Sequence, residues 1–222
     1  MSEPAQTAKD IADELDALRS RSVLEVRRTR RRWSSALQPE EPAAVLAVAD
    51  ALLATTAPRF FAYELVLCHR AALSLVDQAV AERLAGDLDS WGEVDAFSTL
   101  IAGPAWLGRH LPDEAVHQWA VSNNRWWRRA ALVSTTGLNV PNRGGLGDTA
   151  RTLAVCERLV HDRDETVEKA LSWALRELVR HDPAAVASFV DDHLAELAPR
   201  VCREVRSKLT TGLKNKRPAS RS

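Results

Sequence analysis

The sequence predicts an all-α protein, and two observations carry that prediction. Apolar residues recur at helical spacing along nearly the whole chain, as Ile11, Leu15 and Leu18 do near its start. Pro or Gly marks most of the short breaks between these segments, and runs of β-branched residues are rare. The chain has 222 residues, of which 45% are hydrophobic, so it can bury a sizeable core.

The same pattern predicts short helices in sequence: 9–19, 22–36, 42–55, 58–73, 76–86, 90–103, 112–121, 123–136, 147–160, 164–180, 183–194 and 199–212. Short links between helices make sequential neighbours antiparallel. Helix pairs of this size are typical of HEAT-type units, which stack into a solenoid with a concave face. We therefore expect one HEAT-like α-solenoid domain over 1–212 and a basic, disordered tail over 213–222. Residues 137–148 form the one long irregular stretch, either a lid or a simple loop.

Charge is divided unevenly along the chain, although the formal net charge is zero. Residues 1–124 hold 12 Lys and Arg against 18 Asp and Glu, whereas residues 125–222 hold 18 against 12. This asymmetry suggests a partner that carries phosphates.

Cysteine usage and hydropathy indicate the compartment. Cys68, Cys156 and Cys202 are scattered, which indicates reduced thiols in the cytoplasm and no metal site. The polar start has no signal-peptide character, and no stretch reaches the ~18 apolar residues of a membrane helix. A soluble, intracellular monomer without cofactor or membrane partner is expected.

The stretch DSWGEVD places an indole and a carboxylate side by side. Trp91 and Asp95 are four residues apart and therefore share one face of a helix. Asp95 lies inside an apolar run, where capping does not explain it, so it either pairs with a nearby arginine or belongs to a site that holds positive charge.

The stretch KALSWALRELV combines an indole with cations. Lys169, Trp173 and Arg176 fall at i, i+4 and i+7 and line one helical face. The alternative is a core tryptophan whose basic neighbours extend their charged ends to solvent.

Two arginine-rich segments could bind phosphate. Arg125, Arg128 and Arg129 lie at the start of a helix, where free N–H groups and guanidinium forks suit an anion. A solvated basic face with both neighbouring tryptophans in the core is the alternative. The segment VRRTRRRW clusters five further arginines, for which DNA backbone and a generic basic face are equally open.

If Trp91, Asp95, Trp173 and the arginines converge, they form a cleft with two indole faces, one carboxylate and phosphate-binding cations. Cations are attracted to indole faces by ~0.5–2 kcal/mol. A carboxylate stabilises positive charge far better in a dry cleft than in water. Loss of a cationic alkylpurine from deoxyribose passes through an oxocarbenium-like sugar, and a carboxylate and a water meet its needs.

The segments SWGEVD, NRWWRRAALVST, KALSWALRELVRHDP and REVRSKLTTGLKN resemble the AlkD family of DNA alkylation-repair proteins. The likeness covers roughly residues 40–212. It implies a HEAT-like solenoid that binds double-stranded DNA carrying alkylated bases and releases N3- and N7-alkylated purines without flipping the base. It also implies that the protein acts in the cytoplasm, at the nucleoid.

The resemblance also implies a role for single residues. Asp95 would stabilise the sugar and position water, and Trp91 and Trp173 would pack against the deoxyribose. Arg129 and Arg176 would hold the backbone, with Arg125, Arg128 and Lys169 as further DNA-binding residues. The Arg-rich helix, Gly92 and the long loop depart from the family pattern. A non-catalytic binder of damaged or branched DNA and a HEAT-like scaffold are the alternative functions.

Overall fold

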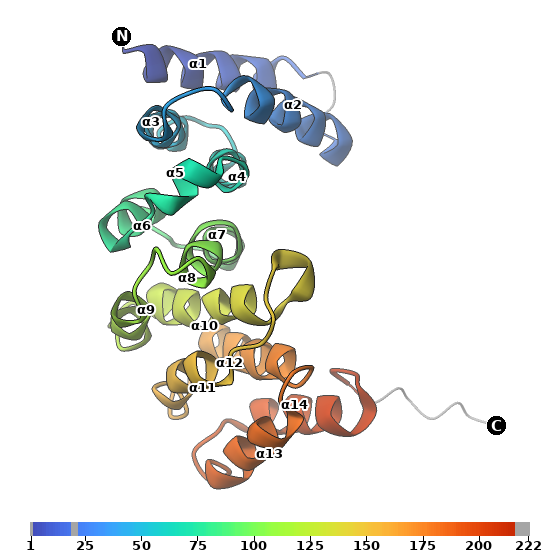
Figure 1. Ribbon diagram of the computed structural model, residues 1–222. Coiled ribbons are helices and arrows are strands. Elements are labelled where there is room, and N and C mark those ends of the chain that lie inside the picture. Colours follow the sequence, from blue (N-terminus) through green and yellow to red (C-terminus); the bar gives the residue numbers. More distant parts are fainter. Residues whose placement is uncertain (1, 19–21, 216–222) are drawn as a thin grey trace, which may run out of the picture. The chain divides into compact units, whose positions relative to one another are not determined.

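The computed structural model describes residues 2–18 and 22–215, and every regular element within these ranges is helical (Figure 1). The predicted all-α class is therefore confirmed. The chain divides into two compact units, Met1–Pro112 and Asp113–Ser222, called here the first and the second unit. The single domain and the solenoid with its concave face concern how these units are arranged, and both stay predictions.

The first unit is built on stacked helices around large aromatic side chains. Its helices are α1 (Glu3–Asp16), α2 (Val23–Ala36), α3 (Pro42–Leu53), α4 (Arg59–Cys68), α5 (Arg70–Ser74), α6 (Gln78–Ala85), α7 (Trp91–Phe97) and α8 (Gly103–Leu107). α1 packs on α3, and α3 packs on α4. Phe61, Tyr63, Phe97 and Trp106 are fully buried and form the centre of this core.

Three helix predictions in the first unit are wrong in detail. α1 begins at Glu3 rather than at residue 9, because Pro4 is tolerated in a first turn. The helix predicted over 58–73 is broken at His69, whose Nδ1 accepts a hydrogen bond of 3.0 Å from the Ala72 N–H and so caps α5.

The third error lies at the end of α7. One α-helix is predicted over 90–103, but α7 ends at Phe97. The chain then continues as a π-helical segment, Ser98–Ala102, and after that as α8. Pro104 has no N–H to give to the carbonyl four residues before it, and the wider π turn lies directly ahead of this proline.

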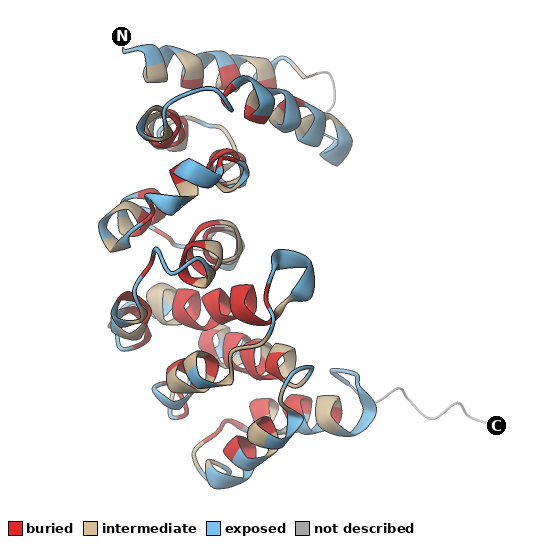
Figure 2. Ribbon diagram, viewed as in Figure 1, coloured by how far each residue is buried: buried red, intermediate tan, exposed pale blue. Residues whose placement is uncertain are grey.

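The second unit contains one helix that is buried over most of its length. Its helices are α9 (Asp113–Ala120), α10 (Arg125–Asn139), a 3₁₀ turn (Pro141–Arg143), α11 (Thr149–Glu157), α12 (Glu165–Leu178), α13 (Pro183–Asp192) and α14 (Pro199–Thr211). α10 packs against α9, α11 and α12, and α12 packs against α14. Every residue of α10 from Arg129 onward is buried, which Figure 2 shows as a continuous red stretch.

The irregular stretch after α10 is shorter than predicted and firmly attached. α10 runs on to Asn139, whose side-chain amide donates to Thr135 O at 3.0 Å and to Thr152 Oγ1 at 2.8 Å. The side-chain oxygen Oδ1 of Asn139 accepts the Asp148 N–H at 3.1 Å. These bonds tie both ends of the loop to the unit, which favours a fixed loop over a lid.

Gly145 lies directly against the end of α10, so Gly145→Ala is expected to destabilise the protein by about 2 kcal/mol. An added Cβ would stand 2.6 Å from the Leu138 carbonyl carbon, and backbone must shift to relieve the clash. Urea unfolding followed by circular dichroism measures the change. Gly92→Ala is the matched control, since a Cβ there meets nothing within 4 Å. Helix propensity should make that variant about 0.5–1 kcal/mol more stable. Equal effects of both changes would contradict the close approach.

Part of the predicted tail lies outside the described residues. Residues 213–215 follow the C-cap Gly212, which adopts the left-handed conformation with φ of 71°. The prediction of a disordered segment over 216–222 falls beyond the described chain.

Candidate nucleic-acid interface

The predicted acid and indole lie together at the start of α7, in the first unit. Trp91 is the first residue of the helix and 67% exposed, and Asp95 is half-buried one turn later. An indole this exposed contributes little to the core, so the structure leaves it available for a ligand. The placement of both residues on one helical face agrees with the spacing in the sequence.

A feature that the sequence analysis missed follows Asp95 directly. The π-helical segment Ser98–Ala102 continues α7, and the Thr99 hydroxyl donates to the Asp95 carbonyl at 2.7 Å. The Ser98 hydroxyl is buried without a hydrogen-bond partner among the described residues. π turns within helices are frequent at functional sites. Pro104 was the only signal of this turn in the sequence.

The arginines at the start of α10 belong to the second unit and are tied to its structure. Arg128 pairs with Asp162 at 2.6 Å and also donates to the Ser122 and Asn123 carbonyls at 3.0 Å each. Arg129 is 7% exposed and donates to the Thr166 carbonyl at 2.6 Å. Arg128 therefore joins α10 to the segment that leads into α12, and Arg129 joins it to the first turn of α12 itself.

Arg125 is the most accessible arginine of this group. Its guanidinium lies 4.8 Å from the centre of the Trp126 ring and 3.5 Å from the Asp164 carboxylate. Half of the side chain is exposed, so a phosphate can reach it without unfolding the helix start. The N–H groups of this helix start are partly used by the cap, since Asn124 Oδ1 accepts the Trp126 N–H.

The Asp164 carboxyl, which pairs with Arg125, makes the stability of the protein depend on pH. Burial by itself raises the pKa of this carboxyl. Hydrogen bonds from Thr166 and from the Val167 N–H, together with the charge of Arg125, lower the pKa by more than burial raises it, so the net shift is downward from 3.8. A carboxyl with a depressed folded-state pKa stabilises the fold above its unfolded pKa and loses that contribution as the pH falls.

The melting temperature of the protein should therefore fall as the pH drops below about 4, and Asp164→Asn should weaken this dependence. Asn is also a good N-cap, so the variant removes the titrating group while keeping a cap. Thermal denaturation of both proteins between neutral and acid pH measures the difference. Parallel curves for the two proteins would show that Asp164 does not contribute.

The third predicted group lies on α12, also in the second unit. Trp173 is half-buried, and its indole N–H donates to Glu177 Oε1 at 3.2 Å. Arg176 donates to Ser172 Oγ at 3.2 Å and approaches Glu204 to 4.0 Å. Burial lowers the pKa of this guanidinium, and the two carboxylates Glu204 and Glu177 oppose that shift.

Lys169 stands apart from this pair at the outer end of the stripe. It is half-exposed and pairs with Glu165 at 2.9 Å. A surface pair of this kind contributes little to stability, so the ammonium is easily drawn to a phosphate.

A cavity of about 430 Å³ opens beside Trp173. It is lined by Val140, Pro141, Asn142, Arg143, Trp173, Glu177 and Arg180. His181 fixes the loop that forms one wall, since its Nε2 lies 2.6 Å from the Asn139 carbonyl. A cavity that is lined by an indole and two arginines can bind a sugar–phosphate. No pattern in the sequence pointed to Arg143.

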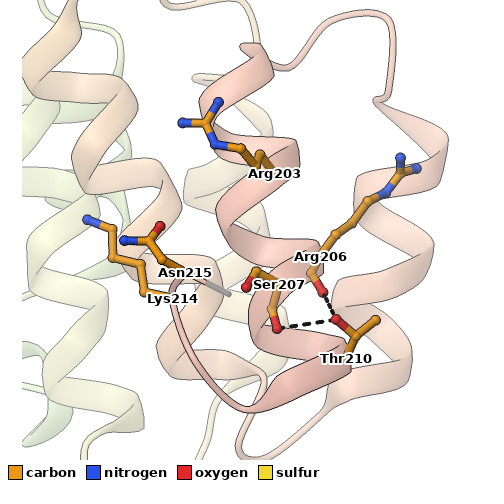
Figure 3. Close-up of a pocket in the computed structure, with 6 residues that line it drawn as sticks. All are labelled: Arg203, Arg206, Ser207, Thr210, Lys214 and Asn215. Atoms are coloured by element: carbon orange, nitrogen blue, oxygen red, sulfur yellow. Dashed lines mark hydrogen bonds between the residues drawn. The ribbon is translucent and has the colours of Figure 1, made fainter. Parts of the chain in front are cut away.

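A second basic cavity, of about 500 Å³, lies on α14 and was also missed. It is lined by Arg203, Arg206, Ser207, Thr210, Lys214 and Asn215. Figure 3 shows Arg203, Lys214 and Asn215 on one side of the helix, whereas Arg206 extends along the other. Arg206 pairs with Asp191 at 2.8 Å, and Lys214 lies 3.5 Å from Glu204.

The residues of each predicted group lie on one helix, as expected, but the groups themselves belong to different units. Trp91 and Asp95 share α7 of the first unit, whereas Trp173 and the arginines of α10 and α12 belong to the second. The cleft that would combine them therefore stays a prediction. Within 2–18 and 22–215, no group of three or more His, Cys, Asp or Glu side chains could hold a metal ion. No helix in these ranges has the length and apolar character to cross a bilayer.

These features define an all-helical protein that presents exposed or half-buried indoles beside carboxylates and cations. Residues 3–209 match the sequence model of a family described as DNA alkylation repair enzyme, and the chain belongs to this family. Comparisons with curated proteins and with solved structures found no match. Family membership gives the protein a role in the repair of alkylation damage, as an enzyme that acts on DNA.

Proposed function

We propose that the protein is a monofunctional DNA glycosylase for cationic alkylated purines such as 3-methyladenine and 7-methylguanine in duplex DNA. The observation that carries this proposal is the half-buried carboxylate of Asp95 one turn from the exposed indole of Trp91. Family membership supports alkylated DNA as the substrate.

The reaction replaces the bond between C1′ and the purine nitrogen by a bond to water. The bonding electrons leave with the base, which neutralises its positive charge, so no general acid is needed. The sugar becomes oxocarbenium-like, and the Asp95 carboxylate stabilises this charge. Water then adds at C1′ and gives its proton to the carboxylate or to solvent. The products are the free base and an abasic site.

The remaining predicted residues bind the DNA around this centre. Trp91 and Trp173 pack against the deoxyribose of the lesion, and the base stays in the duplex. Arg125, Arg176 and Lys169 contact phosphates, while Arg128 and Arg129 hold the start of α10 in place for that contact. The protein acts as a monomer on the nucleoid.

Base release from N-methylated duplex DNA tests the proposal. Chromatography with mass detection should find free 3-methyladenine or 7-methylguanine, together with abasic sites that break in alkali. Borohydride should trap no covalent enzyme–DNA adduct, because the mechanism uses no lysine nucleophile. Tight, salt-sensitive binding to damaged DNA without any release would instead indicate the non-catalytic binder.

A further inference from the structure

An apolar groove with a basic border lies on the first unit, and none of the residues used above lines it. It has a volume of about 450 Å³ and is lined by Val23, Val26, Arg27, Pro58, Phe60 and Glu64. Val23 is 65% exposed and Phe60 39% exposed. Exposed apolar side chains that cluster around a groove mark an interaction site more often than singly scattered ones do.

The groove lies between α2 and the start of α4. Of the residues of α2, only Thr29 and Ser34 are buried, and Figure 2 shows most of this helix as exposed. Leu24, the residue that follows Val23 on α2, is 67% exposed. Burying these side chains against a partner would remove apolar surface from water, which favours binding.

Three arginines of α2 carry charge that the fold does not neutralise. Arg27, Arg28 and Arg31 are exposed, and within the described residues none of them has a carboxylate at ion-pair distance. Their neighbours differ, since Arg30 pairs with Glu64 at 2.9 Å and Arg32 pairs with Glu14. The uncompensated arginines therefore form a positive border one to two turns beyond the apolar end of α2.

We propose that this surface docks an acidic peptide segment that carries large apolar side chains. An apolar anchor fills the groove beside Phe60, and the carboxylates of the segment face Arg27, Arg28 and Arg31. The positions of these residues along α2 fix the orientation of the bound peptide. Its apolar anchor lies at the N-terminal turn of α2, and its acidic residues follow along the axis of the helix. This mode corresponds to helix-in-groove recognition, in which apolar anchors give affinity and charges give orientation.

Charge and hydrophobicity together favour a peptide over DNA at this surface. Phosphates would pair with the arginines, but they would leave Val23, Leu24 and Phe60 exposed to water. The Glu64 carboxylate in the groove wall can also accept N–H groups of a peptide backbone, which a phosphate does not offer. The inference does not depend on glycosylase activity.

Fluorescence anisotropy with the full-length protein tests the proposal. The probe is a labelled synthetic peptide of Asp and Glu residues with two Phe anchors. It should bind saturably, and Phe60→Ser and Leu24→Ser should each weaken binding about 10-fold or more. Arg27→Glu combined with Arg28→Glu should do the same. Leu24 is so exposed that its replacement leaves folding unchanged, which circular dichroism checks.

Matched controls separate docking from general stickiness. Leu146→Ser removes an apolar side chain that is 89% exposed in the second unit, and Arg203→Glu reverses a charge there. Neither change should alter peptide affinity. A second peptide with Ser in place of Phe should bind much more weakly.

Several results would overturn the inference. They are the absence of saturable binding, equal affinity of the two peptides, and no effect of Phe60→Ser or Leu24→Ser. A loss of duplex DNA binding in the Arg27→Glu, Arg28→Glu variant without any peptide binding would make the surface a DNA contact. Self-association that Leu24→Ser abolishes would make it a contact between copies.

Discussion

Asp95→Asn should reduce the rate of base release by about 10²–10³-fold, while the affinity for methylated duplex DNA stays the same. Asn keeps the shape of the side chain and its place on α7, but it loses the negative charge that stabilises the oxocarbenium-like sugar. The loss therefore acts on the transition state and spares the ground state. Single-turnover release of 7-methylguanine measures the rate, and fluorescence anisotropy measures binding.

Glu93→Gln is the matched control for this experiment. Glu93 is a half-buried carboxylate of the same helix, two residues before Asp95, so it points to a different face. Its replacement should leave the rate of base release within about 2-fold of the wild-type rate, because the Glu93 side chain does not reach the reacting atoms. Equal rates for Asp95→Asn and wild type would exclude Asp95 as the catalytic carboxylate.

Glu204→Leu should destabilise the protein by about 3 kcal/mol, the largest stability effect expected here. The Glu204 side chain is 8% exposed and accepts the Ser172 hydroxyl at 2.7 Å. Arg176 and Arg200 lie 4.0 Å from it, and Lys214 lies 3.5 Å away. Removing this carboxylate, which approaches all three cations, leaves Arg176 half-buried without its main counter-charge. Urea unfolding measures the change.

A second substitution distinguishes lost charge pairing from lost packing. Glu204→Leu combined with Arg176→Met should recover most of the stability, because an apolar pair of similar volume replaces a buried ion pair at little cost. Glu165→Ala serves as control, since this exposed carboxylate pairs with Lys169 and Arg200 at the surface, and its loss should leave the unfolding midpoint unchanged. No recovery in the double variant would show that Glu204 acts through packing alone.

Much of the fold follows from local signals in the sequence. Pro42, Pro183 and Pro199 start helices where proline is tolerated, and Gly212 ends the last one. Periodicity then supplies the buried face of each helix. The break at His69 was not foreseeable from this signal, because apolar spacing continues across it and the cap comes from the histidine side chain itself.

The candidate site, too, has features that local sequence patterns predict and features that they do not. The shared face of Trp91 and Asp95 follows from their spacing, since both lie in one helix. The partners of the arginines do not follow from spacing, because Arg128 meets Asp162 and Arg176 meets Glu204 across long stretches of chain. Those contacts depend on how helices pack, which local patterns do not specify.

The burial of α10 on all sides has a kinetic consequence. Amide hydrogens exchange with solvent only when the surrounding structure opens, and the slowest ones report the last part of a domain to open. From Arg129 to Asn139, every residue of α10 is buried, and α9, α11 and α12 of the second unit pack against this helix. Exchange in this helix therefore requires the unit to open as a whole, while α13 and the turns around it can open locally. Arg125 projects from the start of this helix, one turn before the buried stretch begins.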